Sequence, residues 1–245
     1  MTCRVLLLGG TAEARELAEL LAADPTIEVT TALAGRTATP HHPPGELRIG
    51  RFGGPDGLAT WLAGHHIDAV VDATHPYATT ITHNAVTATR HTGHPLLLLR
   101  RPPWHPEPGD RWHWAATLDD IVERLPDLGR RVFLTTGRTD LTVPSALPDL
   151  WFLLRSVDPP TEPPPNVTAI QGKGPFTAAD ELALLRQHRI EVLVTRDSGG
   201  PRTKLDAARA HGIPVLLLRR PTPPANLPVA ETVHEAAAWL AVLRP

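Results

Sequence analysis

Residues 67–78 read Ile-Asp-Ala-Val-Val-Asp-Ala-Thr-His-Pro-Tyr-Ala. An apolar run that ends at Asp72 leads directly into a polar segment, Ala73–Ala78, here called the first elbow. In open α/β sheets, ligands bind just beyond the carboxyl ends of parallel strands. A carboxylate, a hydroxyl, an imidazole and a phenol arrive together at such an end, so the sequence predicts a functional site here.

A second unit of the same kind lies in the other half of the chain. The β-branched run 190–196 leads into Asp197–Gly200, here called the second elbow, and Lys204 follows it. Both units then close in nearly the same letters, HTGHPLLLLRRP at 91–102 and HGIPVLLLRRP at 211–221. The repeat predicts two similar sheet-based halves.

Strands and helices alternate along the whole chain. Apolar runs predict strands at 4–8, 27–34, 47–49, 67–72, 96–99, 132–136, 151–156, 167–170 and 190–196, with a last one near Val215. Helical spacing predicts helices at 12–23, 57–63, 118–125, 176–188, 204–211 and 235–243, with another stretch ending near Gly93. This alternation predicts an α/β fold of two Rossmann-like domains, with mostly parallel sheets and a cleft between the domains.

Proline content suggests where the two domains divide. Residues 102–112 include Pro102, Pro103, Pro106 and Pro108, and proline neither continues a helix nor pairs within a central strand. We therefore expect an N-terminal domain over 1–101, a linker over 102–112 and a C-terminal domain over 113–245.

Composition argues against several classes of function. A formal net charge of −2 over 245 residues gives no electrostatic case for binding nucleic acid or an anionic membrane. The apolar runs are far shorter than the roughly 20 residues of a spanning helix, and no signal-peptide pattern precedes the first strand. A cytoplasmic protein with a small-molecule ligand is expected.

A metal site is not expected. The thirteen histidines are scattered, and neither an H-x-x-x-H nor an H-E-x-x-H pairing occurs. Cys3 is the only cysteine, which excludes an internal disulfide and argues against a thiolate zinc site.

The first strand ends in Gly9-Gly10-Thr11, directly before a helix. Helix N-termini carry unsatisfied N–H groups and a positive dipole end, which favour an anion such as a pyrophosphate. The spacing is not the full G-x-G-x-x-G, so a tight structural turn remains the alternative reading. At the end of the second strand, Arg36 stands where an arginine accommodates the 2′-phosphate of NADP, or is simply a solvated surface residue.

The first elbow also allows two readings. Asp72 and Thr74 can cap the turn that follows, or they can take part in chemistry. His75 and Tyr77 could each donate a proton, and the reference pKa of histidine is better matched to neutral pH.

Three glycine-bearing turns follow strands in the second half: Thr136–Arg138, Gln171–Phe176 and the second elbow. Together they predict a ligand-facing rim, which Arg138, Lys173 and Lys204 would line with positive charge. Such a rim suits a ligand rich in carboxylates or bearing phosphate.

These segments together resemble the precorrin-6A reductase family of cobalamin biosynthesis. The resemblance rests on VLLLGGTAEAR at 5–15, LAGR at 33–36, RFGG at 51–54, VVDATHPYA at 70–78, RPPW at 101–104, GKGPF at 172–176 and DSGG at 197–200. It implies an NADPH-dependent reduction of one double bond in the macrocycle precorrin-6A, giving precorrin-6B, or of the cobalt-containing counterpart. It names precorrin-6A as the partner, with neighbouring enzymes of the pathway as further partners.

The resemblance also distributes roles among the residues. Gly9, Gly10 and Thr11 would hold phosphates, Arg36 the 2′-phosphate, and Thr74, His75, Pro76 and Tyr77 the nicotinamide region. The resemblance leaves Arg138, Lys173, Ser198 and Lys204 facing either the substrate's carboxylates or the cofactor. Our own interpretation assigns substrate binding to Arg138, Lys173, Phe176, Ser198, Gly199 and Lys204. From their positions at the two elbows alone, His75 and Lys204 are the candidate catalytic residues, either of which would assist protonation.

Two alternatives remain open from the sequence. One is a non-catalytic nucleotide-binding or sensory protein in which the same turns hold a ligand without turnover. The other is a corrin-pathway methyltransferase, which would bind S-adenosylmethionine and have no use for Arg36.

Overall fold

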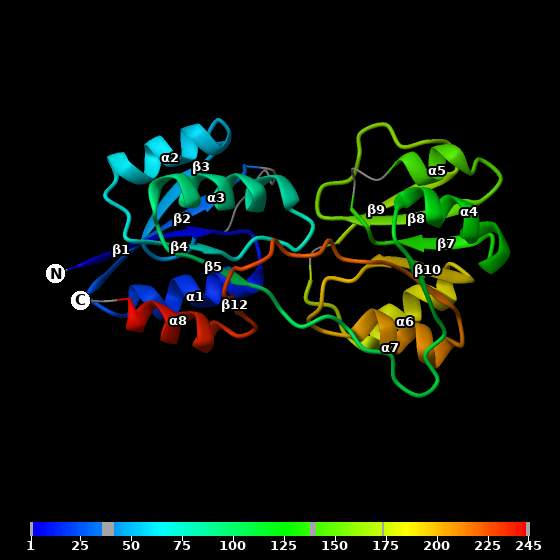
Figure 1. Cartoon of the computed structure of the whole chain (residues 1–245). Coiled ribbons are helices and arrows are strands. Elements are labelled where there is room, and N and C mark those ends of the chain that lie inside the picture. The colour runs from blue at the N-terminus through cyan, green and yellow to red at the C-terminus, as the bar shows by residue number, and fades with distance from the viewer. Residues whose placement is uncertain (1, 36–41, 138–140, 173, 244–245) are drawn as a thin grey trace. The chain divides into compact units, whose positions relative to one another are not determined.

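The computed structural model describes residues 2–35, 42–137, 141–172 and 174–243. The chain divides into two compact units (Figure 1): unit 1 comprises Met1–Pro102 with Pro221–Pro245, and unit 2 comprises Pro103–Arg220. Each unit contains a six-stranded sheet in which every strand pair is parallel. The predicted α/β class with parallel sheets is confirmed.

Unit 1 has the strand order β12-β5-β4-β1-β2-β3. Its elements are β1 (Cys3–Leu8), α1 (Ala12–Ala22), β2 (Ile27–Leu33), β3 (Glu46–Ile49), α2 (Gly54–Gly64), β4 (Ala69–Asp72), α3 (Thr79–Thr92), β5 (Leu96–Leu99), β12 (Val229–Ala230) and α8 (Val233–Val242).

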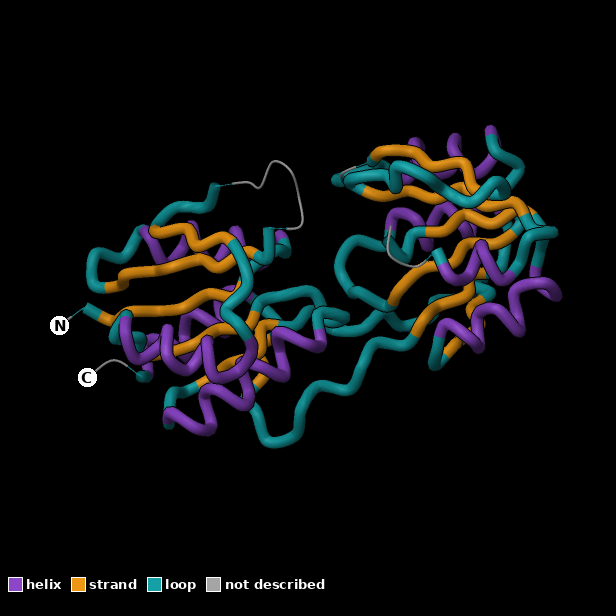
Figure 2. The backbone as a smooth tube through the Cα atoms, turned by 90° about the horizontal axis from the view of Figure 1, so that it is seen from above, coloured by secondary structure: helices purple, strands orange, loops and turns teal. Residues whose placement is uncertain are grey.

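Unit 2 has the order β6-β11-β10-β7-β8-β9. Its elements are β6 (Trp112–Ala115), α4 (Leu118–Leu128), β7 (Arg131–Leu134), α5 (Thr142–Ala146), β8 (Trp151–Ser156), β9 (Val167–Gln171), α6 (Ala178–Gln187), β10 (Val192–Arg196), α7 (Thr203–His211) and β11 (Val215–Leu218). Figure 2 shows the strands of each unit lying side by side in its sheet.

The central strands are apolar on both faces because helices cover both faces. In β1, Val5 and Leu7 pack with α1 and α8, whereas Leu6 and Leu8 pack with α2 and α3 (Figure 1). These four side chains are at most 1% exposed. Burial on both faces explains why the sequence shows a continuous apolar run instead of an alternating one.

The C-terminal segment belongs to unit 1, which corrects the expected domain 113–245. Strand β12 pairs with β5, and α8 buries Val233, Ala236 and Leu240 in the core that also contains α1. The apolar face of α8 identifies it as a core helix, but sequence spacing does not say which of two cores it enters.

The expected linker 102–112 differs from the structure as well. Trp104 is only 6% exposed and packs in the core of unit 2, and Trp112 already begins β6. Proline prevents helix and central-strand pairing, but it does not prevent an extended segment from packing against its own unit.

Both sheets place a switch point between their third and fourth strands. In unit 1 the chain proceeds from β1 outward to β2 and β3, and then returns to the other side of β1 as β4. Unit 2 repeats this path with β7, β8, β9 and β10. Such reversals create the crevice in which open α/β sheets bind ligands.

The placement of α8 can be tested by cavity formation. Leu240→Ala should lower the free energy of unfolding by about 2–5 kcal/mol, because Leu240 is fully buried in unit 1. Val242→Ala is the matched control and should stay within about 0.5 kcal/mol, because Val242 is 84% exposed. In Leu240→Ala, the amides of unit 1 should exchange their hydrogens faster than in the wild-type protein. Faster exchange confined to unit 2 would contradict the assignment.

Candidate functional site

The turn after β1 in unit 1 has the geometry of an anion-binding turn. Gly10 has a φ of +119°, and a Cβ built there would meet no atom within 4 Å. At Gly9 a Cβ would lie 3.0 Å from Thr31 Cγ2, so this position has no room for a side chain. Open space therefore adjoins the backbone of Gly10, directly before the N-terminus of α1. The N–H groups of a helix N-terminus favour an anion in such a position.

Thr11 joins this turn to the first elbow. Its Oγ1 accepts a hydrogen bond from Ala14 N at 3.1 Å, which caps α1, and donates to Ala73 O at 2.8 Å. The Thr11 side chain thus has a structural role, and a phosphate at this turn would be held by backbone N–H groups. Glu13, the acidic residue that could compete at the helix dipole, pairs with Arg101 at 3.3 Å.

Asp72 organises the first elbow from a fully buried position. One carboxylate oxygen accepts hydrogen bonds from Thr74 N at 3.0 Å and Thr74 Oγ1 at 2.6 Å. The other accepts from Thr82 Oγ1 at 2.6 Å and from Arg100 Nη2 at 2.8 Å. The structure therefore supports the capping interpretation for Asp72, which accepts from Thr74 N in the turn that follows, whereas the buried Thr74 hydroxyl donates to Asp72.

Arg100 completes this arrangement from the end of β5. Its Nη1 donates to Asp72 O and to Thr74 O, each at 2.8 Å. The guanidinium thus neutralises the buried carboxylate and also fixes two carbonyl groups of the elbow.

His75, Pro76 and Tyr77 are partly exposed beyond this buried base. The rings of His75 and Tyr77 lie 5.6 Å apart between centroids. Tyr77 N donates to His75 Nδ1 at 3.4 Å, so a neutral His75 carries its proton on Nε2. Proton donation would require the imidazolium form, in which Nδ1 also carries a proton and no longer accepts from Tyr77 N.

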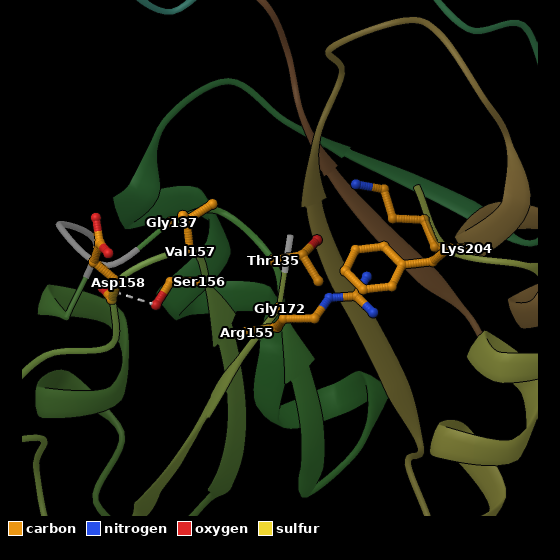
Figure 3. Close-up of a pocket in the computed structure, with 9 residues that line it drawn as sticks. Thr135, Gly137, Arg155, Ser156, Val157, Asp158, Gly172 and Lys204 are labelled. Atoms are coloured by element: carbon orange, nitrogen blue, oxygen red, sulfur yellow. Dashed lines mark hydrogen bonds between the residues drawn. The ribbon is translucent and has the colours of Figure 1, made fainter. Parts of the chain in front are cut away.

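Unit 2 contains a pocket of about 370 Å³ at the carboxyl ends of β7, β8 and β9 (Figure 3). We call this cavity the unit 2 pocket. The residues that line it are Thr135, Gly137, Arg155, Ser156, Val157, Asp158, Gly172, Phe176 and Lys204. The lining combines the cationic side chains of Arg155 and Lys204 with the carboxylate of Asp158, hydroxyl groups and one aromatic ring, so it offers both polar groups and an apolar face to a ligand.

The second elbow lies beside this pocket on the end of β10. Asp197 is 3% exposed and accepts hydrogen bonds from Trp104 N at 3.1 Å and Arg220 Nη2 at 3.2 Å. Trp104 Nε1 donates to Gly200 O at 2.9 Å, and Lys204 Nζ lies 5.4 Å from the Trp104 ring centroid. Trp104 thus supports the second elbow and the first turn of α7.

Comparison with known proteins covers nearly the whole chain. Residues 4–241 match the family model described as precorrin-6x reductase CbiJ/CobK. The chain belongs to this family. Precorrin-6A reductase from Rhodococcus erythropolis is 53% identical over 98% of both chains, and the Mycobacterium tuberculosis H37Rv protein of that name is 47% identical over 98% of both.

A solved structure agrees with the fold. The chain matches one titled CobK precorrin-6A reductase with a TM-score of 0.93 and 41% identity, over 99% of this chain and 97% of that one. The resemblance, the Rossmann-like fold and the enzyme class of oxidoreductase predicted from the sequence are confirmed.

The structure brings some predicted site residues together and leaves others apart. Phe176 and Lys204 both line the unit 2 pocket, whereas Ser198 and Gly199 lie on the second elbow and are not among its lining residues. Arg36, Arg138 and Lys173 lie outside the described residues, so their roles stay predictions. Within the described part of the chain, no cluster of three or more metal-ligating side chains could hold a metal ion.

Sequence reasoning missed Arg155 as a pocket residue. It is the penultimate residue of an apolar strand, and a charged side chain at the carboxyl end of such a strand is the signal that could have identified it. The expected cleft between the two domains stays a prediction.

The buried ion pair of the first elbow can be tested by removing its cation. Arg100→Met should lower the free energy of unfolding by about 3–5 kcal/mol, because it leaves the Asp72 carboxylate buried without a counter-charge. Arg4→Met removes the exposed pair with Glu28 and should cost less than about 1 kcal/mol. Denaturant unfolding measures both, and equal losses would show that the elbow does not depend on this pair.

Proposed function

We propose that this protein reduces precorrin-6A to precorrin-6B with NADPH in cobalamin biosynthesis. The observation that carries the proposal is the match over 98% of both chains to a relative named precorrin-6A reductase. Relatives named for the cobalt-containing substrate are more distant, such as the Salmonella typhimurium protein at 32% identity. This difference supports the cobalt-free macrocycle as the substrate.

We assign NADPH to unit 1. Its β1 leads through the open Gly9-Gly10 turn into an eleven-residue helix, which suits a pyrophosphate. In unit 2, the described helix between β7 and β8 is α5, which has only five residues. The backbone of Gly9, Gly10 and Thr11 would hold the phosphates, and His75, Pro76 and Tyr77 would border the nicotinamide. Thr74 would support this region from beneath.

We assign part of the substrate to unit 2. Precorrin-6A carries several carboxylate arms, and Lys204 brings positive charge to the pocket beside the Phe176 ring. A volume of about 370 Å³ is near the lower limit for a drug-sized ligand, so the pocket would take one edge of the macrocycle. Arg138, Lys173, Ser198 and Gly199 are proposed to contact the remaining arms.

The reduction adds a hydride and a proton across one carbon–carbon double bond. NADPH, when bound, supplies the hydride. The protein must hold the two ligands at reacting distance, which can supply several kcal/mol of the barrier. His75 or Lys204 would deliver the proton.

The described helices include none that is both long and apolar enough to cross a membrane. A cytoplasmic location and association with neighbouring enzymes of the pathway stay predictions.

The function is tested by mixing the protein with NADPH and precorrin-6A and following the loss of dihydronicotinamide absorbance. We expect oxidation of NADPH that depends on precorrin-6A and yields a product with two more hydrogens. Binding of NADPH without oxidation would indicate the non-catalytic alternative. Transfer of a methyl group from S-adenosylmethionine would indicate the methyltransferase.

Arg36 determines cofactor preference in this proposal. Arg36→Ala should raise the Michaelis constant for NADPH about tenfold or more, since a charge-assisted contact contributes roughly 1.5–3 kcal/mol. The constant for NADH should stay nearly unchanged. Arg15→Ala, at an exposed position on α1, is the control and should change neither constant. An equal change in the Michaelis constants for NADPH and NADH would show that Arg36 does not bind the 2′-phosphate.

The proton donor is identified by single-turnover hydride transfer in His75→Ala and Lys204→Ala. Loss of a general acid should slow the step by about 100-fold or more while NADPH still binds. His65→Ala, an exposed histidine stacked on Trp61, should leave the rate unchanged. Wild-type rates in both test variants would mean that neither residue donates the proton.

A further inference from the structure

We infer that Arg155 is a positioning residue, which holds the Phe176 ring as one wall of the unit 2 pocket. The inference rests on the proposed function for its effect on substrate, but its structural part does not. Arg155 lines the pocket, so its charge suggests at first sight a ligand for a substrate carboxylate. Its contacts point to a different role.

The charge of Arg155 is already engaged inside the protein. Its Nη1 and Nη2 donate to the two carboxylate oxygens of Glu181 at 3.0 and 2.7 Å. The side chains are 9% and 1% exposed, so both charges are largely withdrawn from water. Planar, bidentate pairs of this kind are specific in geometry, and breaking one leaves an uncompensated buried charge. Glu181 therefore fixes the plane of the Arg155 guanidinium.

This fixed plane lies against the ring of Phe176. The guanidinium carbon is 3.8 Å from the Phe176 ring centroid and 4.9 Å from that of Phe133, which is fully buried in β7. Figure 3 shows the Arg155 guanidinium lying close against an aromatic ring within the pocket. Guanidinium groups stack on aromatic faces in a way that the lysine ammonium does not reproduce.

Phe176 lies on a loop, where no helix or strand holds its backbone. It precedes Thr177, the N-cap of α6, so it lies on the loop after β9 and outside the helix. Gly172 closes the packing, since a Cβ there would lie 2.8 Å from Arg155 Cδ and 3.1 Å from Phe176 Cζ. The position of this wall therefore depends on three residues in contact: Arg155 with its guanidinium, Phe176 with its ring, and Gly172, which has no side chain.

The structural part is tested without any ligand. The chain has four phenylalanines, so 4-fluorophenylalanine labelling gives four fluorine resonances, and Phe176→Leu identifies that of Phe176. Arg155→Lys should shift and broaden this resonance. Arg131→Lys is the matched control, because Arg131 stacks on Trp151 at 4.1 Å and lies outside the pocket. An unchanged Phe176 resonance in Arg155→Lys would overturn the inference.

The functional part is tested by steady-state kinetics. Arg155→Lys should raise the Michaelis constant for precorrin-6A roughly tenfold and leave that for NADPH unchanged within about twofold. Phe176→Leu should do the same, and the double variant should be no worse than Phe176→Leu alone, because both changes remove one wall. Additive effects would show that Arg155 contacts the substrate directly, which overturns the positioning role.

Gly172→Ala keeps the inference testable if Arg155→Lys does not fold. The added methyl must displace Arg155 or Phe176, so the same resonance and the same Michaelis constant should move. If the resonance moves while wild-type protein does not oxidise NADPH with precorrin-6A, the proposed function fails and the positioning role stands.

Discussion

The buried charge of Asp72 is the constraint on which the first elbow depends. A carboxylate with no access to water must have its oxygens satisfied by the protein, and four donors from Thr74, Thr82 and Arg100 satisfy them. These donors come from the elbow itself, from α3 and from the residue after β5. The same interaction thus fixes the end of β4 against its neighbours and leaves His75 and Tyr77 as the partly exposed residues above it. Unit 2 repeats the principle with Asp197, Trp104 and Arg220.

Five strands of each sheet follow the same order, β5-β4-β1-β2-β3 in unit 1 and β11-β10-β7-β8-β9 in unit 2, but the units differ at the place where a nucleotide would bind. In unit 1 the first strand of the path, β1, is followed by a long, capped helix. In unit 2 the next described helix after the corresponding strand, β7, is the short α5, and a pocket lies at the ends of β7, β8 and β9. A common architecture therefore supports different ligand chemistries, because the loops at the strand ends differ.

Much of the fold could be predicted from the sequence because the central strands are continuous apolar runs with clear ends. Runs such as Leu96–Leu99 and Val215–Leu218 are apolar on both faces, and glycine or proline marks their ends. Of the edge strands, β3 and β9 were predicted, but β6 and β12 were not. In β6 only Ala115 is buried, and β12 has two residues, so neither carries a clear pattern. The elbows and the Gly9-Gly10 turn were recognisable because chemistry at strand ends concentrates unusual residues there.

The roles within the site were less predictable than its location. The sequence around Thr74 does not show that the Thr74 hydroxyl donates to the buried Asp72. Asp72 is buried with Thr82 and Arg100, which come close to it only in the folded chain. Arg155 and Glu181 are 26 residues apart, and their pairing depends on how α6 packs beside β8. Such contacts are decided by tertiary packing, which a single sequence does not encode locally.

The late position of β12 has a consequence for synthesis. Residues of unit 1 leave the ribosome first, yet β5 lacks its outer partner until Val229 and Ala230 have been translated, after all of unit 2. Nascent domains usually fold as they emerge, but this one carries an unpaired strand edge throughout that interval, and such edges invite association with other chains. The protein thus completes its first sheet last, and the nascent chain is most exposed to aggregation while its second half is being made.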